Sequence, residues 1–137
     1  MAFIVDLLTY AILGLTVTWL LYITYMHVAT RAAEGRPAEP LYRCFPALAG
    51  RTGRALVYCY SPQCGPCRPM SKEVDSVAAR GVPIYKLDIT EHPDVSRDIG
   101  IRATPTLIVI EDGAIARMIL GVKTADFMLD LMATPAR

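Results

Sequence analysis

ALVYCYSPQCGPCRPMSKEVDSVAAR, residues 55–80, is the stretch that decides the fold. Residues 55–61 are rich in β-branched and aromatic side chains, which predicts a buried strand. Over residues 64–80 the apolar side chains recur at spacings of three and four, which predicts a helix. The CGPC sequence therefore places Cys64 and Cys67 between a buried strand and the helix that follows it.

The elements after this pair continue to alternate. We expect a strand over 82–89, a short helix ending at Gly100, two strands over 104–110 and 114–121, and a last helix capped by Thr124. The sequence Glu111-Asp112-Gly113 is a tight-hairpin signal between the two later strands. This order of strands and helices predicts an α/β domain with a mixed central sheet flanked by helices.

The position of the two cysteines predicts their chemistry. Cys64 is expected at or just before the N-terminus of the helix, where free N–H groups and the helix dipole favour the thiolate over the thiol. Cys67, one turn later on the same side, can reach the sulfur of Cys64 and resolve a mixed disulfide. Pro66 suits the first turn of the helix because it has no N–H group. A C-x-x-C sequence in this setting is typical of a thiol–disulfide exchange site.

The amino-terminal segment has a different character. From Leu7 to Val28 the chain holds twenty-two residues without Asp, Glu, Lys or Arg. As a helix it would be about 33 Å long, enough to cross a hydrocarbon core of about 30 Å. A buried core helix and a cleaved signal peptide are the alternatives, but no Lys or Arg precedes the span as a signal peptide requires. We expect a transmembrane anchor over 1–29, a linker over 30–40 and a globular domain over 41–137.

Positive charges predict the orientation of this anchor. Arg31, Arg36 and Arg43 follow the span and none precedes it, so the positive-inside rule places the domain in the cytoplasm. The amino-terminal tail is very short, and a periplasmic or other outer-face location stays open.

Composition excludes several classes of protein. The formal net charge is +1 and no basic stripe is present, so we expect no nucleic-acid partner. Four cysteines are too few for a secreted disulfide scaffold, and Cys44 and Cys59 are not spaced as a second zinc-binding pair. We expect no metal, and we interpret Cys44 and Cys59 as buried thiols.

Residues 54–132 resemble the thioredoxin family. CGPCRPM is similar to the family's active-site segment, and KLDITEHPDVSRDIGIRATPT, which starts at Lys86, is similar to the segment that ends in its cis-proline. The resemblance implies a thioredoxin fold, with Pro105 cis and facing the two cysteines. It also implies that Gly65, Pro66, Thr104 and Pro105 contact an extended substrate strand. We expect no cofactor, because the redox-active disulfide Cys64–Cys67 carries the chemistry.

The chain departs from the family pattern at two positions beside the motif. Tyr58 stands where thioredoxins usually carry a buried Asp, and Gln63 stands where they usually carry Trp. Lys86 matches the family's lysine partner of that Asp. Deprotonation of Cys67 then needs another route through Lys86, water or the phenol of Tyr58. Because a buried negative charge is missing, both thiolates should form more easily, and we expect a more oxidising couple than in ordinary thioredoxin.

The leading functional prediction is a reductase that transfers electrons from a reductase or thiol donor to disulfides of partner proteins near a membrane. CGPC resembles the reducing branch of the family. A disulfide isomerase or oxidase on the outer face is one alternative, and a redox-inactive membrane-bound interaction subunit is another.

Overall fold

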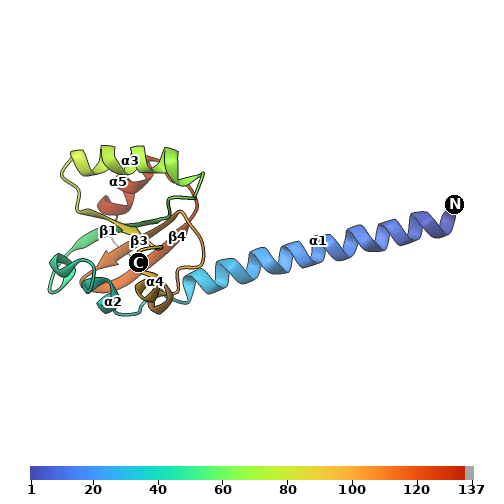
Figure 1. Ribbon diagram of the computed structural model, residues 1–137, viewed down its shortest axis with the longest axis horizontal. Coiled ribbons are helices and arrows are strands. Elements are labelled where there is room, and N and C mark those ends of the chain that lie inside the picture. Colours follow the sequence, from blue (N-terminus) through green and yellow to red (C-terminus); the bar gives the residue numbers. More distant parts are fainter. Residues whose placement is uncertain (135–137) are drawn as a thin grey trace.

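The computed structural model describes residues 1–134 and consists of a small α/β domain with one long helix projecting from it (Figure 1). The elements in chain order are α1 (Ala2–Arg31), α2 (Glu39–Tyr42), the 3-10 helix η1 (Pro46–Leu48), β1 (Arg54–Tyr60), α3 (Cys67–Ala79), β2 (Ile84–Asp88), α4 (Pro93–Ile99), β3 (Thr106–Glu111), β4 (Ala114–Leu120) and α5 (Ala125–Ala133). The predicted strands and helices of the domain are all present.

The four strands form one mixed sheet in the order β2-β1-β3-β4. β1 is parallel to β2 and antiparallel to β3, and β3 is antiparallel to β4. The hairpin between β3 and β4 turns at Asp112 and Gly113, both of which have positive φ, as the Asp-Gly sequence predicts.

Helices cover both faces of the sheet (Figure 1). Alternate residues of β1 point to opposite faces, so that Leu56 and Tyr58 pack with α3 and α5, while Val57 and Cys59 pack with α2 and α4. All four of these side chains are fully buried. Burial on both faces explains why β1 reads in the sequence as an uninterrupted apolar run.

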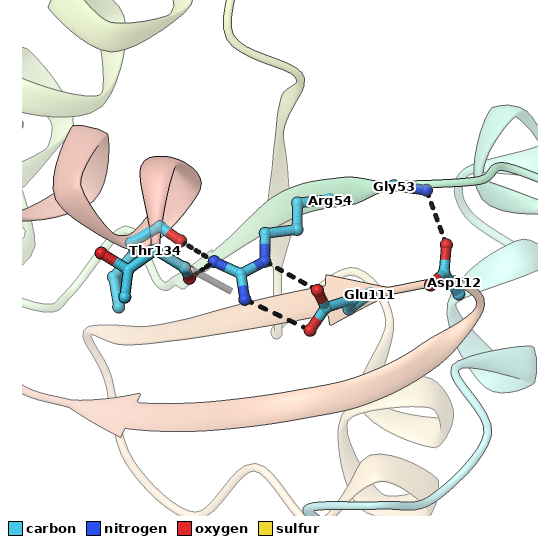
Figure 2. Close-up of polar contacts among 6 residues, drawn as sticks. Gly53, Arg54, Glu111, Asp112 and Thr134 are labelled. Carbon is cyan, nitrogen blue, oxygen red and sulfur yellow. Dashed lines mark hydrogen bonds and ion pairs between the residues drawn. The ribbon is translucent and has the colours of Figure 1, made fainter. Parts of the chain in front are cut away.

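Arg54 forms an ion pair and hydrogen bonds at the end of the sheet where β1 begins. Arg54 donates to both carboxylate oxygens of Glu111 on β3, at 3.1 and 3.3 Å, and its guanidinium also donates to the carbonyl groups of Leu131 and Thr134 at the end of α5 (Figure 2). The Arg54 side chain is 10% exposed. This contact joins β1, β3 and α5 at the end of the sheet away from the cysteines.

The segment before β1 contains only short helical elements. Residues 41–51 hold only the end of α2 and the 3-10 helix η1. In the part of the chain that the structure describes, no strand pairs with the outer side of β2, which is therefore an edge of the sheet.

Residues 30–40, the expected linker, pack in part against the domain. Ala33 and Ala38 are buried, and Pro37 forms an isolated antiparallel bridge with Ala114 at the start of β4. The segment connects α1 to the domain while packed against the edge of the sheet. Small apolar side chains separated by polar ones let it bury one side and expose the other.

Most of the described side chains of α1 are exposed and none of them is fully buried, so α1 is not a core helix. Its stretch from Phe3 to Ala29 is long and apolar enough to cross a membrane, judged by length and composition. Within that stretch the threonine hydroxyls donate to backbone carbonyls of the same helix, as Thr9 does to the carbonyl of Val5 at 2.8 Å. A helix that satisfies its own polar groups in this way suits a lipid environment.

Candidate active site

The two cysteines of CGPC form a disulfide where β1 passes into α3. Their sulfur atoms lie 2.12 Å apart and their Cα atoms 5.3 Å apart. β1 ends at Tyr60 and α3 begins at Cys67, so Cys64 occupies the connecting turn, three residues before the first helical residue. The N–H of Cys67 donates to the carbonyl of Cys64 at 3.3 Å, which tightens this turn.

The two sulfurs differ in their access to solvent. Cys64 is partly exposed, whereas Cys67 is 3% exposed and belongs to the core beneath α3. This difference agrees with the prediction that Cys64 meets a partner and Cys67 resolves the mixed disulfide. The thirteen residues of α3 direct their dipole and free N–H groups at this turn, which favours a thiolate there.

Gly65 and Pro66 lie between the cysteines and are both exposed. Pro66 is the N-cap of α3. Its φ of −62° and its helical ψ give its backbone the conformation of the helix that follows. Contact of these two residues with a substrate strand stays a prediction.

The Thr104–Pro105 segment lies at the same end of the sheet as the disulfide. The peptide bond between Thr104 and Pro105 is cis. The next residue, Thr106, pairs with Cys59 near the end of β1, and the Pro105 carbonyl accepts from the N–H of Gly121 at 2.9 Å. The cis bond agrees with the expectation drawn from the resemblance. That Pro105 faces the two cysteines, and that Thr104 and Pro105 bind substrate, stay predictions.

Tyr58 lies beneath the start of α3, where thioredoxins usually have a buried carboxylate. Its hydroxyl donates to the carbonyl of Cys67 at 2.9 Å and lies 3.1 Å from the hydroxyl of Ser71, which can donate to it in turn. Burial raises the pKa of Tyr58 above its ordinary value, so the phenol keeps its proton at neutral pH. The phenol thus supports the first turn of α3 through the Cys67 backbone, and its predicted part in proton transfer stays untested.

Ser71 is the residue of this group that the sequence reasoning missed. It lies four residues after Cys67, one helical turn further on the same face of α3, and that spacing is the signal that could have found it.

Lys86 lies beside Tyr58 in the register of β1 and β2, but its ammonium group forms an ion pair with Asp75 on α3. Both side chains are well exposed, so the pair contributes little to stability. Lys86 lowers the pKa of Tyr58, yet less than burial raises it. A role for Lys86 in proton transfer stays a prediction.

The other two cysteines are free thiols. Cys59 is fully buried within β1, and this burial strongly raises the pKa of its thiol. Cys44 is partly buried, and desolvation raises the pKa of its thiol as well. Both environments oppose the thiolate, in contrast to the turn before α3. Among residues 1–134, no three side chains of His, Cys, Asp or Glu gather into a group that could hold a metal ion.

A redox-active disulfide at the start of a helix, on a mixed sheet covered by helices on both faces, defines a thiol–disulfide oxidoreductase. The family model for thioredoxin matches residues 46–134, and the chain belongs to the thioredoxin family.

Individual relatives agree with this assignment. The chain is 31% identical to a thioredoxin of Chlamydia caviae over 83 residues, which cover 59% of this chain and 81% of the relative. It is 29% identical to a thioredoxin of Bacillus subtilis over 83 residues, covering 58% and 80%. Among solved structures, a mutant thioredoxin from Halobacterium salinarum superposes with a TM-score of 0.60 at 24% identity, covering 66% of this chain and 81% of that one. The match to that structure shows the shared fold.

Proposed function

We propose that this protein is a single-pass membrane-anchored disulfide reductase whose domain faces the cytoplasm. The observation that carries the reductase assignment is the disulfide between partly exposed Cys64 and buried Cys67 at the start of α3. The anchor is supported by the length and apolar composition of α1. The orientation is supported by the arginines that follow the span.

The exchange proceeds in two steps. The Cys64 thiolate attacks one sulfur of a partner's disulfide, a mixed disulfide forms, and the other partner sulfur leaves as a thiolate that takes up a proton. Cys67 then loses its proton and attacks the sulfur of Cys64, which closes the Cys64–Cys67 disulfide and releases the second partner thiolate. Two electrons pass from the dithiol to the partner. A dithiol reductase or a small thiol returns the pair to its reduced state.

Insulin reduction by the full chain in detergent, with a thiol reductant present, tests this proposal. We expect turnover by the unchanged chain and none by Cys64→Ser. The Cys67→Ser variant should stop at the mixed disulfide and hold partner proteins through Cys64. Cys44→Ser is the matched control and should retain turnover, because Cys44 lies outside the site. An unchanged chain that fails to reduce insulin would instead favour an interaction subunit without redox activity.

An oxidase or isomerase on the outer face is the second candidate. The observation that favours it is the absence of a buried Asp or Glu among residues 1–134, with Tyr58 in the place beneath Cys67. Protease protection of the domain in sealed membrane vesicles distinguishes the two locations, and the reduction potential distinguishes the two directions of electron flow.

A further inference from the structure

The segment that follows α1 is hydrogen-bonded along β4. The N–H of Ala38 donates to the carbonyl of Gly113 at 2.9 Å, and the N–H of Gly35 donates to the carbonyl of Ile115 at 2.8 Å. One residue earlier, the Glu34 carboxylate accepts from the N–H of Met118 at 3.3 Å. Moving back along the chain toward α1 therefore moves forward along β4, toward its C-terminal end.

The same direction continues into α1 itself. His27 and Arg31 line a cavity of about 400 Å³ together with residues 117–120 of β4. Two residues before His27, the ring of Tyr25 lies under the guanidinium of Arg102, 5.8 Å from its centroid. The last turns of the apolar stretch therefore contact the end of β4 and the segment that leads to cis-Pro105.

This is the end of the sheet that carries the disulfide. Thr106 at the start of β3 pairs on one side with Cys59, one residue before the end of β1, and on the other with Leu120, the last residue of β4. The turn with Cys64 thus lies at the end of the sheet from which α1 departs, and α1 projects outward from that end (Figure 1).

The rise of a helix and the span of an extended chain give the height of Pro105 relative to the end of the apolar stretch. Tyr25 lies four residues before Ala29, about 6 Å inside the end of that stretch at ~1.5 Å per residue. Arg102, which contacts Tyr25, is three residues from Pro105, a separation of at most about 11 Å. If α1 spans a bilayer to Ala29, Pro105 lies near the height of the lipid headgroups.

The surface at this end of the domain is suited to such surroundings. Within residues 1–134 and outside α1, the exposed large hydrophobic side chains are Val122, at 46% exposure, and Phe127, at 37%. Both come after Gly121 in the chain, and the N–H of Gly121 donates a hydrogen bond to the carbonyl of Pro105. The ammonium of Lys123 lies 5.5 Å from the centroid of the Phe127 ring. Apolar side chains beside a lysine resemble the composition of surfaces that meet lipid headgroups.

We propose that the Cys64–Cys67 centre faces the membrane surface and that its substrates are disulfides of membrane-embedded proteins, exposed at the height of the lipid headgroups. The inference rests on the proposed reductase function and on α1 as the anchor. It holds for either side of the membrane, because the domain and α1 keep the same relative placement on both.

A set of reporters at graded heights tests this inference. Full-length Cys67→Ser protein is reconstituted in phosphatidylcholine vesicles with a synthetic transmembrane helix that carries one cysteine activated as a disulfide with thionitrobenzoate. The cysteine is placed about 0, 10, 20 or 30 Å above the bilayer on a rigid helical extension of ~1.5 Å per residue. Attack by Cys64 releases the coloured thiol. We expect release to be fastest at the two lowest heights and at least tenfold slower at the greatest.

Two insertions provide matched variants. Ten Gly and Ser residues inserted between Arg31 and Ala32 free the domain from α1 and should make the rate nearly independent of height. The same ten residues inserted between Gly50 and Arg51, in an exposed loop at the opposite end of the sheet, should leave the height dependence unchanged. With Cys67 restored, both insertion variants should reduce insulin as the unchanged chain does.

The outcomes separate the inference from the function on which it rests. One outcome is a release rate that stays constant or rises with reporter height for Cys67→Ser without insertions, while the chain with Cys67 reduces insulin normally. That outcome would overturn the membrane-facing site and leave the reductase assignment standing. No reaction with insulin or with any reporter would overturn both.

Discussion

Replacing Tyr58 by Phe isolates the hydrogen bonds beneath Cys67 from everything else that this side chain does. The ring stays, so the stacking on Tyr60, with centroids 5.5 Å apart, is kept and no cavity opens. What is lost is the O–H that donates to the Cys67 carbonyl at 2.9 Å. The second partner, Ser71, is only partly buried, and its hydroxyl can turn to water.

These contacts give the size of the effect. One buried hydrogen bond contributes about 1 kcal/mol net, and the loss of the Ser71 contact adds little because water replaces it. We therefore expect the free energy of unfolding to fall by about 1 kcal/mol. For a domain of this size that lowers Tm by about 5 °C.

Thermal unfolding of the oxidised full chain in detergent measures this change. Tyr60→Phe is the matched control, because it deletes the same atom from a tyrosine whose hydroxyl forms no side-chain hydrogen bond found within residues 1–134. The control should melt within about 1 °C of the unchanged chain. Equal Tm values for the two variants would refute a supporting role for the Tyr58 hydroxyl.

Turnover with insulin gives a second readout on the same variant. A general acid or base contributes about 10²–10⁴-fold to a rate. Because the phenol is directed at a backbone carbonyl and its raised pKa keeps it protonated, we expect Tyr58→Phe to lose less than tenfold. A loss of a hundredfold or more, with the Tm only slightly changed, would show that the phenol carries the proton of Cys67.

Three further predictions concern redox poise, alkaline stability and the end of the sheet held by Arg54. Equilibration with glutathione should give a reduction potential above about −270 mV, and a value at or below that figure would contradict the effect assigned to the missing carboxylate. The pKa of Cys59 is raised in the folded protein, so its stabilising effect is complete below the unfolded pKa of about 8.5 and is lost as pH rises above it. Between pH 7.5 and 9.5 the unchanged chain should therefore lose about 1.4 kcal/mol more stability than Cys59→Ala, measured by urea unfolding; equal losses would refute this. Arg54→Ala leaves Glu111 without its partner and should cost about 3 kcal/mol, whereas Arg51→Ala, at an exposed site, should cost less than about 0.5 kcal/mol in the same assay.

Much of the fold followed from local sequence patterns. The buried run of β1 and the three- and four-residue spacing of α3 placed the cysteines at a strand-to-helix junction, and the structure confirms both elements. The Thr124 cap of α5 is also confirmed, since its hydroxyl accepts from the N–H of Phe127. Each of these signals acts between residues a few positions apart, so a single chain carries the whole of the information.

The sequence alone determined that an apolar helix precedes a domain with an exchange site at Cys64 and Cys67. The tertiary structure decided what lies beneath and beside that site. It paired the Tyr58 phenol with the Cys67 carbonyl, and it packed residues 33–38 against β4 so that α1 leaves from the active-site end. These contacts join residues from 9 to 84 positions apart. Whether such groups meet depends on how the sheet and helices pack together, which periodicity along one segment does not encode.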